Sequence, residues 1–524
     1  MEASNLQIYW HESQPVYSLC FQENGNKFKL FTAGGDNKVR AWHLNTQASE
    51  TEENCVRVET IDFLSSLQQH EQAVNVVRFN NCAPRNTLAT AGDDGQVLLW
   101  RQNDTIVREF GMDDAEASEV KESWYVHKRL RYSSNSEIYD LCWSPDDRYI
   151  IVGCMDNCMR IFDVESERCI VNVKDHNHYV QGVAWDPLNK YVFSQSADRS
   201  MHIYRLIFAS DDPKRLESVK LRNRIVRTDL PSRRAGCKPL NFDVTKTANL
   251  FHNETLPSFF RRLTVSPCGS ILCVPAGIYR TEAKSTASES GTPDPSDTTS
   301  GSDNNATEYC NAVHMYTRGA FNQDKMPHRP VVSLPFLKKP AIVVSFNPQL
   351  YEKQLSKSEF LDLPHRLIFA VATSNEVLIY DLEHAEPLSV IGNMHYTPLT
   401  DLAWSADGTL LMVSSTDGFC SYVSLDPELL GKVKPFEIMA EPEVSAAKVE
   451  HKASAVISST PAPATDTKPV KKAFDIVNVL PVKRKLPSQT AQEPTAERTP
   501  EKAKRRVQPT LLDVGVKDTN ENKV

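Results

Sequence analysis

A short pattern that recurs five times limits the folds open to this chain more than any other feature of its sequence. Each copy has a strand-forming run, a turn centred on an aspartate, and a second run that ends on a larger side chain. The copies are AGGDNKVRAW, AGDDGQVLLW, GCMDNCMRIF, QSADRSMHIY and SSTDGFCSYV. Their aspartates are Asp36, Asp94, Asp156, Asp198 and Asp417, and six positions later stand Trp42, Trp100, Phe162, Tyr204 and Val423. A β unit repeated in this way predicts an all-β protein made of many small sheets.

Seven apolar runs indicate how many units there are: PVYSLCF, AVNVVRF, EIYDLCW, YVQGVAW, FFRRLTV, AIVVSFN and PLTDLAW. Most lead into turn-forming residues, although the fifth and sixth units are degenerate. His70, His176 and His395 stand 22 to 24 residues before a turn aspartate, which suits a structural hydrogen bond to it. The pattern resembles the WD-repeat β-propeller, in which four-stranded blades surround a channel.

We therefore predict a seven-bladed WD-repeat β-propeller over residues 1–434, followed by a disordered tail over residues 435–524. The turn aspartates and the bulky residues six positions later, such as Trp42 and Trp100, are expected to be structural. The low-complexity stretch at residues 281–309 is expected to be a disordered insert. The segment LQIYWH, residues 6–11, is expected to complete the last blade and close the ring, which removes exposed sheet edges.

The composition points away from several classes of protein. The longest apolar runs fall short of 18 residues and the N-terminus lacks a signal-peptide pattern, so we expect an intracellular protein with no membrane span. Twelve cysteines are scattered without any C-x-x-C pair, and we find no phosphate-binding, nucleophile-elbow or zinc-protease motif. We therefore expect no catalytic residues, no metal and no cofactor, and a role as a non-enzymatic binding scaffold.

The mouth of the channel is where a propeller of this kind is expected to bind a partner. Aligning the seven first runs brings Tyr17, Tyr139, Phe259, Arg261 and Arg262 to this region, and we predict a partner surface there. Two adjacent arginines in a core strand could instead pair internally with Asp140 or Asp401, and the sequence leaves both interpretations open.

The strand sequences also resemble one family, the middle WD-repeat subunit of chromatin assembly factor 1. The resemblance rests on PVYSLCF, AVNVVRF, YVQGVAWDP, SFFRRLTVSPCGSILCVPAG, LPHRLIFAVAT and LTDLAWSADGTLLMVSSTDGFCSYV. It implies a nuclear heterotrimer with a large and a small subunit, which deposits histones H3 and H4 during replication-coupled and repair-coupled nucleosome assembly. It implies no direct sequence-specific DNA binding and no membrane contact. The alternatives are the replication-independent histone regulator subunit and a WD-repeat substrate receptor of a ubiquitin ligase.

The tail differs from the rest of the chain in charge. Residues 468–506 contain eleven Lys and Arg against four Asp and Glu, a net charge of +7, whereas the whole chain carries −8. Five of these residues fit a bipartite nuclear-import signal, although a solvated charge run would look the same: Lys471, Lys472, Lys483, Arg484 and Lys485. Thr499, which precedes a proline, is a candidate site for proline-directed phosphorylation.

The segment KAKRRVQPTLLDV, residues 502–514, is too apolar for a plain solvated tail. It resembles the short basic and apolar segment by which the histone regulator family binds the anti-silencing histone chaperone. The resemblance assigns docking roles to Lys504, Arg505, Arg506, Val507, Pro509 and Leu511. A second nuclear-import cluster would explain the charges but not the aliphatic residues.

Overall fold

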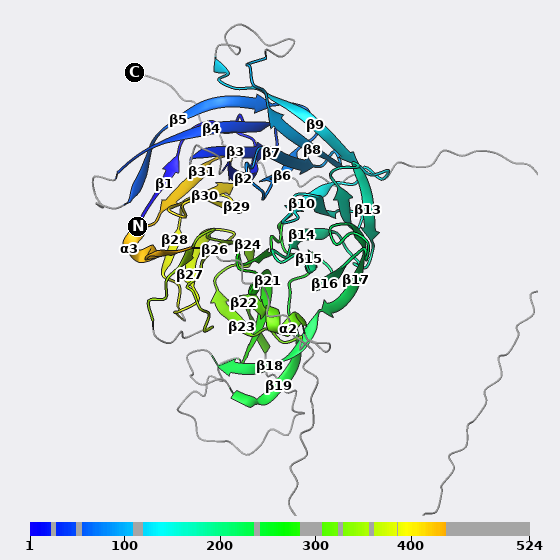
Figure 1. Cartoon of the computed structure of the whole chain (residues 1–524). Helices are drawn as coiled ribbons and strands as arrows, with labels where there is room; N and C mark the ends of the chain where they lie inside the picture. The colour runs from blue at the N-terminus through cyan, green and yellow to red at the C-terminus, as the bar shows by residue number, and fades with distance from the viewer. Residues whose placement is uncertain are drawn as a thin grey trace, which may run out of the picture. The chain divides into compact units, whose positions relative to one another are not determined.

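The computed structural model describes residues 1–22, 28–48, 55–107, 119–234, 241–282, 307–322, 328–355, 361–384 and 386–435. These residues form a ring of seven antiparallel blades around a central channel (Figure 1), which confirms the predicted fold class. Among them, no helix is long and apolar enough to cross a membrane. The predicted tail motifs, from Lys471 to Leu511, lie outside these residues.

Each blade has four strands, numbered from the channel outward. Blades 1 to 4 are β2–β5 (Val16–Gln22, Lys29–Gly34, Val39–Ala48, Val56–Leu67), β6–β9 (Val74–Phe79, Thr87–Gly92, Gln96–Gln102, Trp124–Arg131), β10–β13 (Ile138–Trp143, Tyr149–Cys154, Met159–Asp163, Arg168–Val173) and β14–β17 (Val180–Trp185, Tyr191–Ser196, Ser200–Phe208, Leu216–Ile225). Blade 5 is β20–β23 (Thr264–Val265, Ile271–Glu282, Thr307–Thr317, Val332–Leu337), and blade 6 is β24, β26, β27 and β28 (Ala341–Phe346, Ile368–Thr373, Glu376–Asp381, Ser389–Gly392).

Blade 7 joins the two ends of the propeller. It contains β29 (Leu399–Trp404), β30 (Leu410–Ser415), β31 (Cys420–Ser424) and, as its outer strand, β1 (Glu2–Leu6). Strand β1 runs antiparallel to β31 and pairs Glu2 with Ser424 and Leu6 with Cys420. The extra strand was therefore predicted correctly in kind but was misplaced, because it covers residues 2–6 and not residues 6–11.

Residues 7–11 instead supply a buried anchor for blade 1. Trp10 and His11 are fully buried, and His11 Nδ1 lies 2.6 Å from Asp36 Oδ1. His11 Nε2 also lies 2.9 Å from Thr32 Oγ1, which accepts a hydrogen bond from Trp42 Nε1. Burial works to raise the pKa of Asp36, but the hydrogen bond from His11 holds it below its usual value.

The same chain of hydrogen bonds recurs in blade 2, where His70 contacts Asp94 at 2.8 Å and Thr90 accepts from Trp100 Nε1. His176 contacts Asp198 and His395 contacts Asp417 at 3.2 and 3.0 Å. In blade 3, Asp156 pairs with Arg160 in place of a histidine. The turn aspartates thus lie in structural contacts at the ends of their blades.

The apolar core lies between neighbouring blades. In one cluster, Phe31 and Leu67 of blade 1 pack with Trp100 and Trp124 of blade 2, so the bulky repeat residue bridges two sheets. Burying an aromatic side chain of this size contributes about 1.5 to 3 kcal/mol of transfer free energy. The repeated large residues therefore hold adjacent blades together.

Several shorter elements lie outside the regular blades. The hairpin of β18 (Arg227–Arg234) and β19 (Asn241–Asn249) pairs with the far end of β21, and β25 (Leu350–Tyr351) pairs with β32 (Val433–Lys434). The helices α2 (Arg318–Asn322) and α3 (Pro427–Leu430) are short. Strands β21 and β22 reach residues 282 and 307, so the predicted insert at 281–309 was drawn slightly too wide, and residues 283–306 lie outside the description.

His314 of β22 provides a test of the packing of blade 5. It is fully buried, with Nδ1 2.9 Å from Ser333 Oγ and Nε2 3.0 Å from the Leu250 carbonyl oxygen. Burial lowers its pKa from 6.5 to about 4. Below pH 6.5 the unfolded chain therefore takes up a proton here that the folded protein refuses until about pH 4. The free energy of unfolding should thus fall as the pH is lowered through this range.

We predict that His314→Gln removes about 2 kcal/mol of the stability difference between pH 7 and pH 5, because one titrating group is lost. Urea denaturation at both pH values measures this difference, with His328→Gln, which replaces an exposed histidine, as the matched control. An unchanged pH dependence in His314→Gln would show that this histidine titrates normally in the folded protein.

Candidate protein-docking site at the propeller channel

The inner strands share an irregularity that shapes the channel. In six blades the register of the inner strand shifts by one residue at the same position. The bulged residues are Tyr17, Asn75, Tyr139, Gln181, Ile342 and Thr400. A bulge of this kind bends its strand and redirects the neighbouring side chains. The residues that follow the bulges include Ser18, Asp140 and Asp401, which place polar groups on the channel axis.

Blade 5 follows a different arrangement. The backbone N–H of Arg261 donates to Gln181 O of blade 4 at 3.1 Å, and that of Arg262 donates to Ile342 O of blade 6 at 3.0 Å. A Cβ atom on Gly182 would lie only 1.9 Å from Arg261 O, so this close approach requires glycine. The inner segment of blade 5 is therefore hydrogen-bonded directly to both of its neighbours.

Arg262 is the centre of a buried charge cluster. Its guanidinium lies 3.2 Å from Asp401 and 3.4 Å from Asp140, and Arg78 lies 2.9 Å from Asp401. Asp401 also accepts from Ser18 Oγ at 2.6 Å. Burial works to raise the pKa of Asp401, but Arg262 and Arg78 hold it below its usual value. Two cations and two carboxylates thus balance one another near the axis of the channel.

Arg262 also connects blades through backbone carbonyls. It donates to the oxygens of Tyr17, Asn75 and Thr400 at 3.1, 2.7 and 2.9 Å, which belong to blades 1, 2 and 7. The guanidinium lies 4.1 Å from the centre of the Phe260 ring. One side chain of blade 5 therefore links three other inner strands across the channel.

These positions correct the prediction of a partner surface at the two arginines. Arg261 is fully buried and donates to the carbonyls of Ser196, His252 and Asn253, and Arg262 is 3% exposed. Burial lowers the pKa of Arg261 to about 10. Because both guanidinium groups are satisfied internally, the structure has the internal arrangement that the sequence left as the alternative.

The exposed aromatic residues lie at one end of the channel, where the loops between blades lead into the inner strands. We call this end the loop side. Phe259 is 60% exposed, with its ring centroid 6.4 Å from that of Tyr139, and Tyr17 packs on Phe260 at 6.0 Å. Tyr9 and Tyr396, in two neighbouring loops, are 79% and 101% exposed. The sequence analysis missed this pair, although both stand within two residues of the turn histidines His11 and His395.

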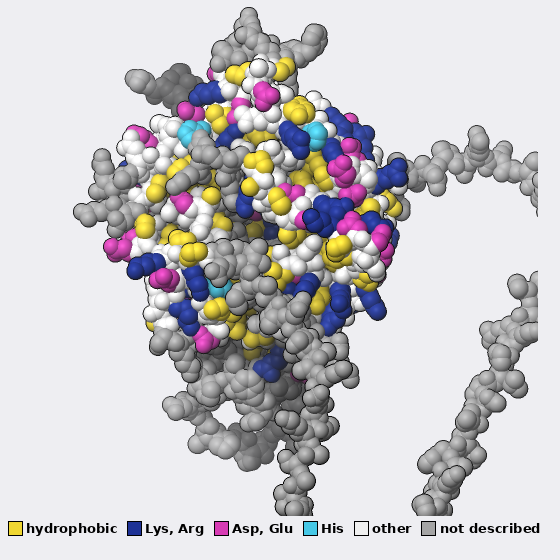
Figure 2. All heavy atoms as spheres, viewed as in Figure 1, with side chains coloured by type: hydrophobic (Ala, Val, Ile, Leu, Met, Phe, Trp, Pro, Cys, Tyr) yellow, Lys and Arg dark blue, Asp and Glu magenta, His cyan; other side chains and the backbone are white. Residues whose placement is uncertain are grey.

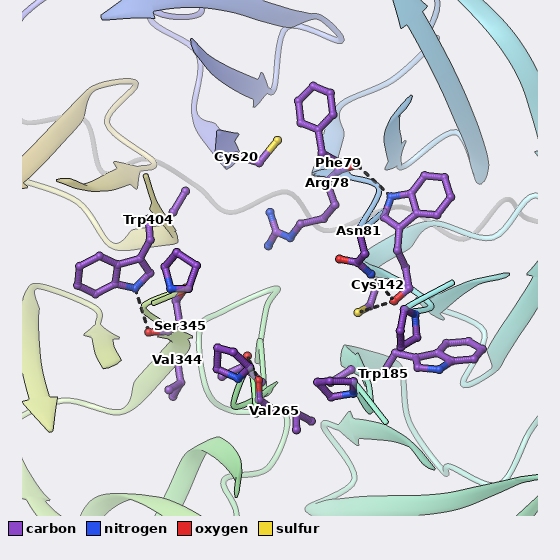
Figure 3. Close-up of a pocket in the computed structure, with 18 of the residues that line it drawn as sticks. Cys20, Arg78, Phe79, Asn81, Cys142, Trp185, Val265, Val344, Ser345 and Trp404 are labelled. Atoms are coloured by element: carbon purple, nitrogen blue, oxygen red, sulfur yellow. Dashed lines mark hydrogen bonds between the residues drawn. The ribbon is translucent and has the colours of Figure 1, made fainter. Parts of the chain in front are cut away.

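The opposite end, which we call the turn-side funnel, is a cavity of about 1080 Å³. The last residues of the inner strands and the turns that follow them line it, including Trp143, Trp185 and Trp404 (Figure 3). Trp143 Nε1 donates to Arg78 O and Trp404 Nε1 donates to Ser345 O. Lys434 and Pro435 also line the funnel, so the described chain ends at its wall.

Charged side chains of both signs cover the outer edge of the ring. Figure 2 shows Lys and Arg side chains near β13 and β17, interspersed with Asp and Glu. Strand β17 carries exposed Lys220 and Arg224. Within the described ranges, no group of three or more His, Cys, Asp or Glu residues could hold a metal ion. What the channel offers is therefore two differently built surfaces for binding another molecule.

The charge cluster generates a prediction about stability. Arg262→Ala would leave Asp140 and Asp401 buried with one cation fewer and would free three buried carbonyls. We expect a loss of about 3 to 5 kcal/mol in the free energy of unfolding, measured by denaturant titration, because a broken buried ion pair leaves an uncompensated charge. The control Arg131→Ala removes an exposed arginine and should change stability by less than about 0.5 kcal/mol. Equal effects of the two substitutions would contradict a structural role for Arg262.

Comparison with known proteins agrees with this architecture. Residues 1–292 and 294–430 match the family model described as the CAF1B/HIR1 beta-propeller domain. The CAF1B component of chromatin assembly factor 1 from Saccharomyces cerevisiae is 46% identical over 98% of this chain and 100% of its own length, and the protein of the same name from Mus musculus is 33% identical over 85% and 71%. Protein HIR1 of Yarrowia lipolytica is 27% identical over 80% of this chain and 38% of its own length. The chain therefore belongs to the CAF1B family of chromatin assembly factor β-propeller scaffolds.

Proposed function

We propose that this chain is the WD-repeat scaffold of a nuclear heterotrimer that deposits histones H3 and H4 during replication-coupled and repair-coupled nucleosome assembly. The observation that supports it most strongly is the similarity to a CAF1B protein of chromatin assembly factor 1 over 98% of the chain, propeller and tail together. The similarity to histone regulator proteins is weaker, at 27% identity over 38% of the length of one relative. The proposal therefore favours the first family over its replication-independent counterpart.

The loop side of the channel is the surface that we assign to the large subunit. Phe259, Tyr9 and Tyr396 expose aromatic area there, and aromatic residues are enriched at the energetic centres of protein interfaces. Phe259 is supported from below by Phe260, which packs on Tyr17 and Arg262. A rigid base presenting exposed rings suits a partner segment with an apolar face, because few side chains must be ordered on binding.

We predict that Phe259→Ser with Tyr396→Ser weakens capture of the large subunit without destabilising the propeller. Co-expression of the full chain with the large and small subunits, followed by affinity purification, measures capture, and thermal unfolding measures stability. The matched control Tyr125→Ser removes a 43% exposed ring from the outer strand β9 and should leave capture unchanged. Full capture by the double variant would place the large subunit elsewhere on the chain. If no chromatin assembly partner co-purifies with the unmodified chain, the proposed complex itself is wrong.

The tail carries the remaining proposals. Lys471, Lys472, Lys483, Arg484 and Lys485 are proposed to direct nuclear import, and phosphate on Thr499 is proposed to place negative charge near Lys504. Residues 504–511 are proposed to bind the anti-silencing histone chaperone by adding a strand to an exposed sheet edge. In that mode backbone hydrogen bonds hold the segment, while Arg505, Arg506, Val507 and Leu511 specify it and Pro509 keeps it extended.

Calorimetric titration of a peptide covering residues 495–520 against the purified chaperone tests the docking proposal. We expect a Kd on the order of micromolar, because two buried aliphatic side chains contribute about 1.5 to 3 kcal/mol each before ordering costs. Both Arg506→Glu and the pair Val507→Ala with Leu511→Ala should abolish measurable binding. The control Lys517→Glu makes the same charge change outside the segment and should bind normally. Binding that survives the loss of both aliphatic residues would favour an import signal.

A further inference from the structure

Cys268 lies in a turn whose counterparts in other blades hold a carboxylate. The turn between the inner and second strands reads SPDDR in blade 3, SPCGS in blade 5 and SADGT in blade 7. In blade 7, Asp407 Oδ1 accepts from Ser405 Oγ at 2.7 Å, Thr409 N at 3.1 Å and Thr409 Oγ1 at 2.8 Å. The third residue of this turn therefore occupies a position surrounded by hydrogen-bond donors, which suits a negative charge.

Blade 3 repeats the arrangement and blade 5 changes only its occupant. Asp146 accepts from Ser144 Oγ at 2.6 Å and from Arg148 N at 3.3 Å. In blade 5 the sulfur of Cys268 takes this place, 3.4 Å from Ser266 Oγ and 3.3 Å from Ser270 Oγ. Ser266 Oγ already accepts from Ile271 N, so its own proton is free to point at the sulfur. The fold thus surrounds a thiol with the donors that it offers to a carboxylate elsewhere.

A second group converges on the same thiol from the funnel wall. His365 is 8% exposed and lines the funnel with Cys268, and its Nε2 has no hydrogen-bond partner among the residues that the structure describes. On the other side of the turn, Arg318 donates to the carbonyl oxygen of Gly269 at 2.7 Å. A buried imidazole nitrogen in this position gains a partner when the thiol becomes a thiolate.

The ionisation of the thiol follows from these contacts. Partial burial works to raise the pKa of Cys268, but hydrogen bonds from His365, Ser266 and Ser270 outweigh it and lower the pKa to about 7. Two other cysteines line the same funnel, and burial raises the pKa of Cys142 to about 11 and that of Cys20 to about 12. Because thiolates are the reactive form, Cys268 differs chemically from its neighbours in one cavity.

We propose that Cys268 is a modification site: a thiolate held in an anion-binding turn, which exchanges with low-molecular-mass disulfides and so places a covalent adduct in the turn-side funnel. The thiolate attacks one sulfur of a disulfide such as oxidised glutathione. A new S–S bond forms as the old one breaks, and the second sulfur leaves with the electron pair as a thiolate that takes a proton from water. The disulfide is the only oxidant required, and a free thiol reverses the step.

The test uses the full chain and compares cysteines within one molecule. Brief treatment with iodoacetamide at pH 7, and separately with oxidised glutathione, is followed by mass spectrometry of each cysteine-containing peptide. Modification of Cys268 should be at least about tenfold faster than that of Cys142 in the same funnel, since the greater intrinsic nucleophilicity of a high-pKa thiolate only partly offsets its scarcity. It should also exceed that of the exposed Cys82, whose pKa partial burial and Asp147 raise.

Variants separate the donors from general accessibility. Ser270→Ala and His365→Ala should each slow modification of Cys268 severalfold at pH 7 and move the midpoint of its rate against pH upward from about 7, while leaving Cys82 unchanged. Cys268→Asp restores the residue of the sister turns, so it should fold with an unchanged melting temperature and take no adduct at this site. Equal rates at Cys268, Cys142 and Cys82 would overturn the proposal, as would unfolding of Cys268→Asp.

Discussion

Closure of the ring is the constraint on which the rest of this structure depends. Seven blades can share one channel only if the first and last are joined, and the joint is the pairing of β1 with β31 across more than four hundred residues of sequence. Without it, β31 would present a row of unpaired backbone groups, which favours association with other chains. Once the joint is made, every inner strand faces the same axis, and residues such as Arg262 and Asp401 can meet across it.

The channel then works as two surfaces separated by a buried polar layer. On the loop side, aromatic rings stand on a rigid base formed by Phe260 and the guanidinium of Arg262. On the turn side, tryptophan indoles and turn residues enclose the funnel, with the backbone of Arg78 bonded to Trp143. Because Arg262 contacts carbonyls of blades 1, 2 and 7, movement of one inner strand would disturb its hydrogen bonds to the others. The two surfaces therefore share one support.

The sequence was sufficient to predict the seven blades, because the aspartate turn and the bulky residue six positions later report local geometry that repeats. It placed the closing strand a few residues late, since YWH at residues 9–11 looks more strand-like than EASNL at residues 2–6. His11 was missed because its spacing of 25 residues to Asp36 exceeds that of the other histidines. The surroundings of Arg262 could not be read from local pattern, because its partners come from other blades. The shared turn of Cys268, Asp146 and Asp407 was visible in the alignment of the repeats, but its meaning required the hydrogen bonds.

The position of β1 also has a consequence for synthesis. Strand β1 leaves the ribosome first, yet its partner β31 is the last regular strand of the propeller to be made. Translation at about 5 to 20 residues per second imposes a delay on the order of half a minute between them. During that interval the nascent propeller has an open edge at each end, and a pairing between such distant segments is intrinsically slow to form. Protection of the nascent chain by molecular chaperones would matter most in this interval, before the ring is closed.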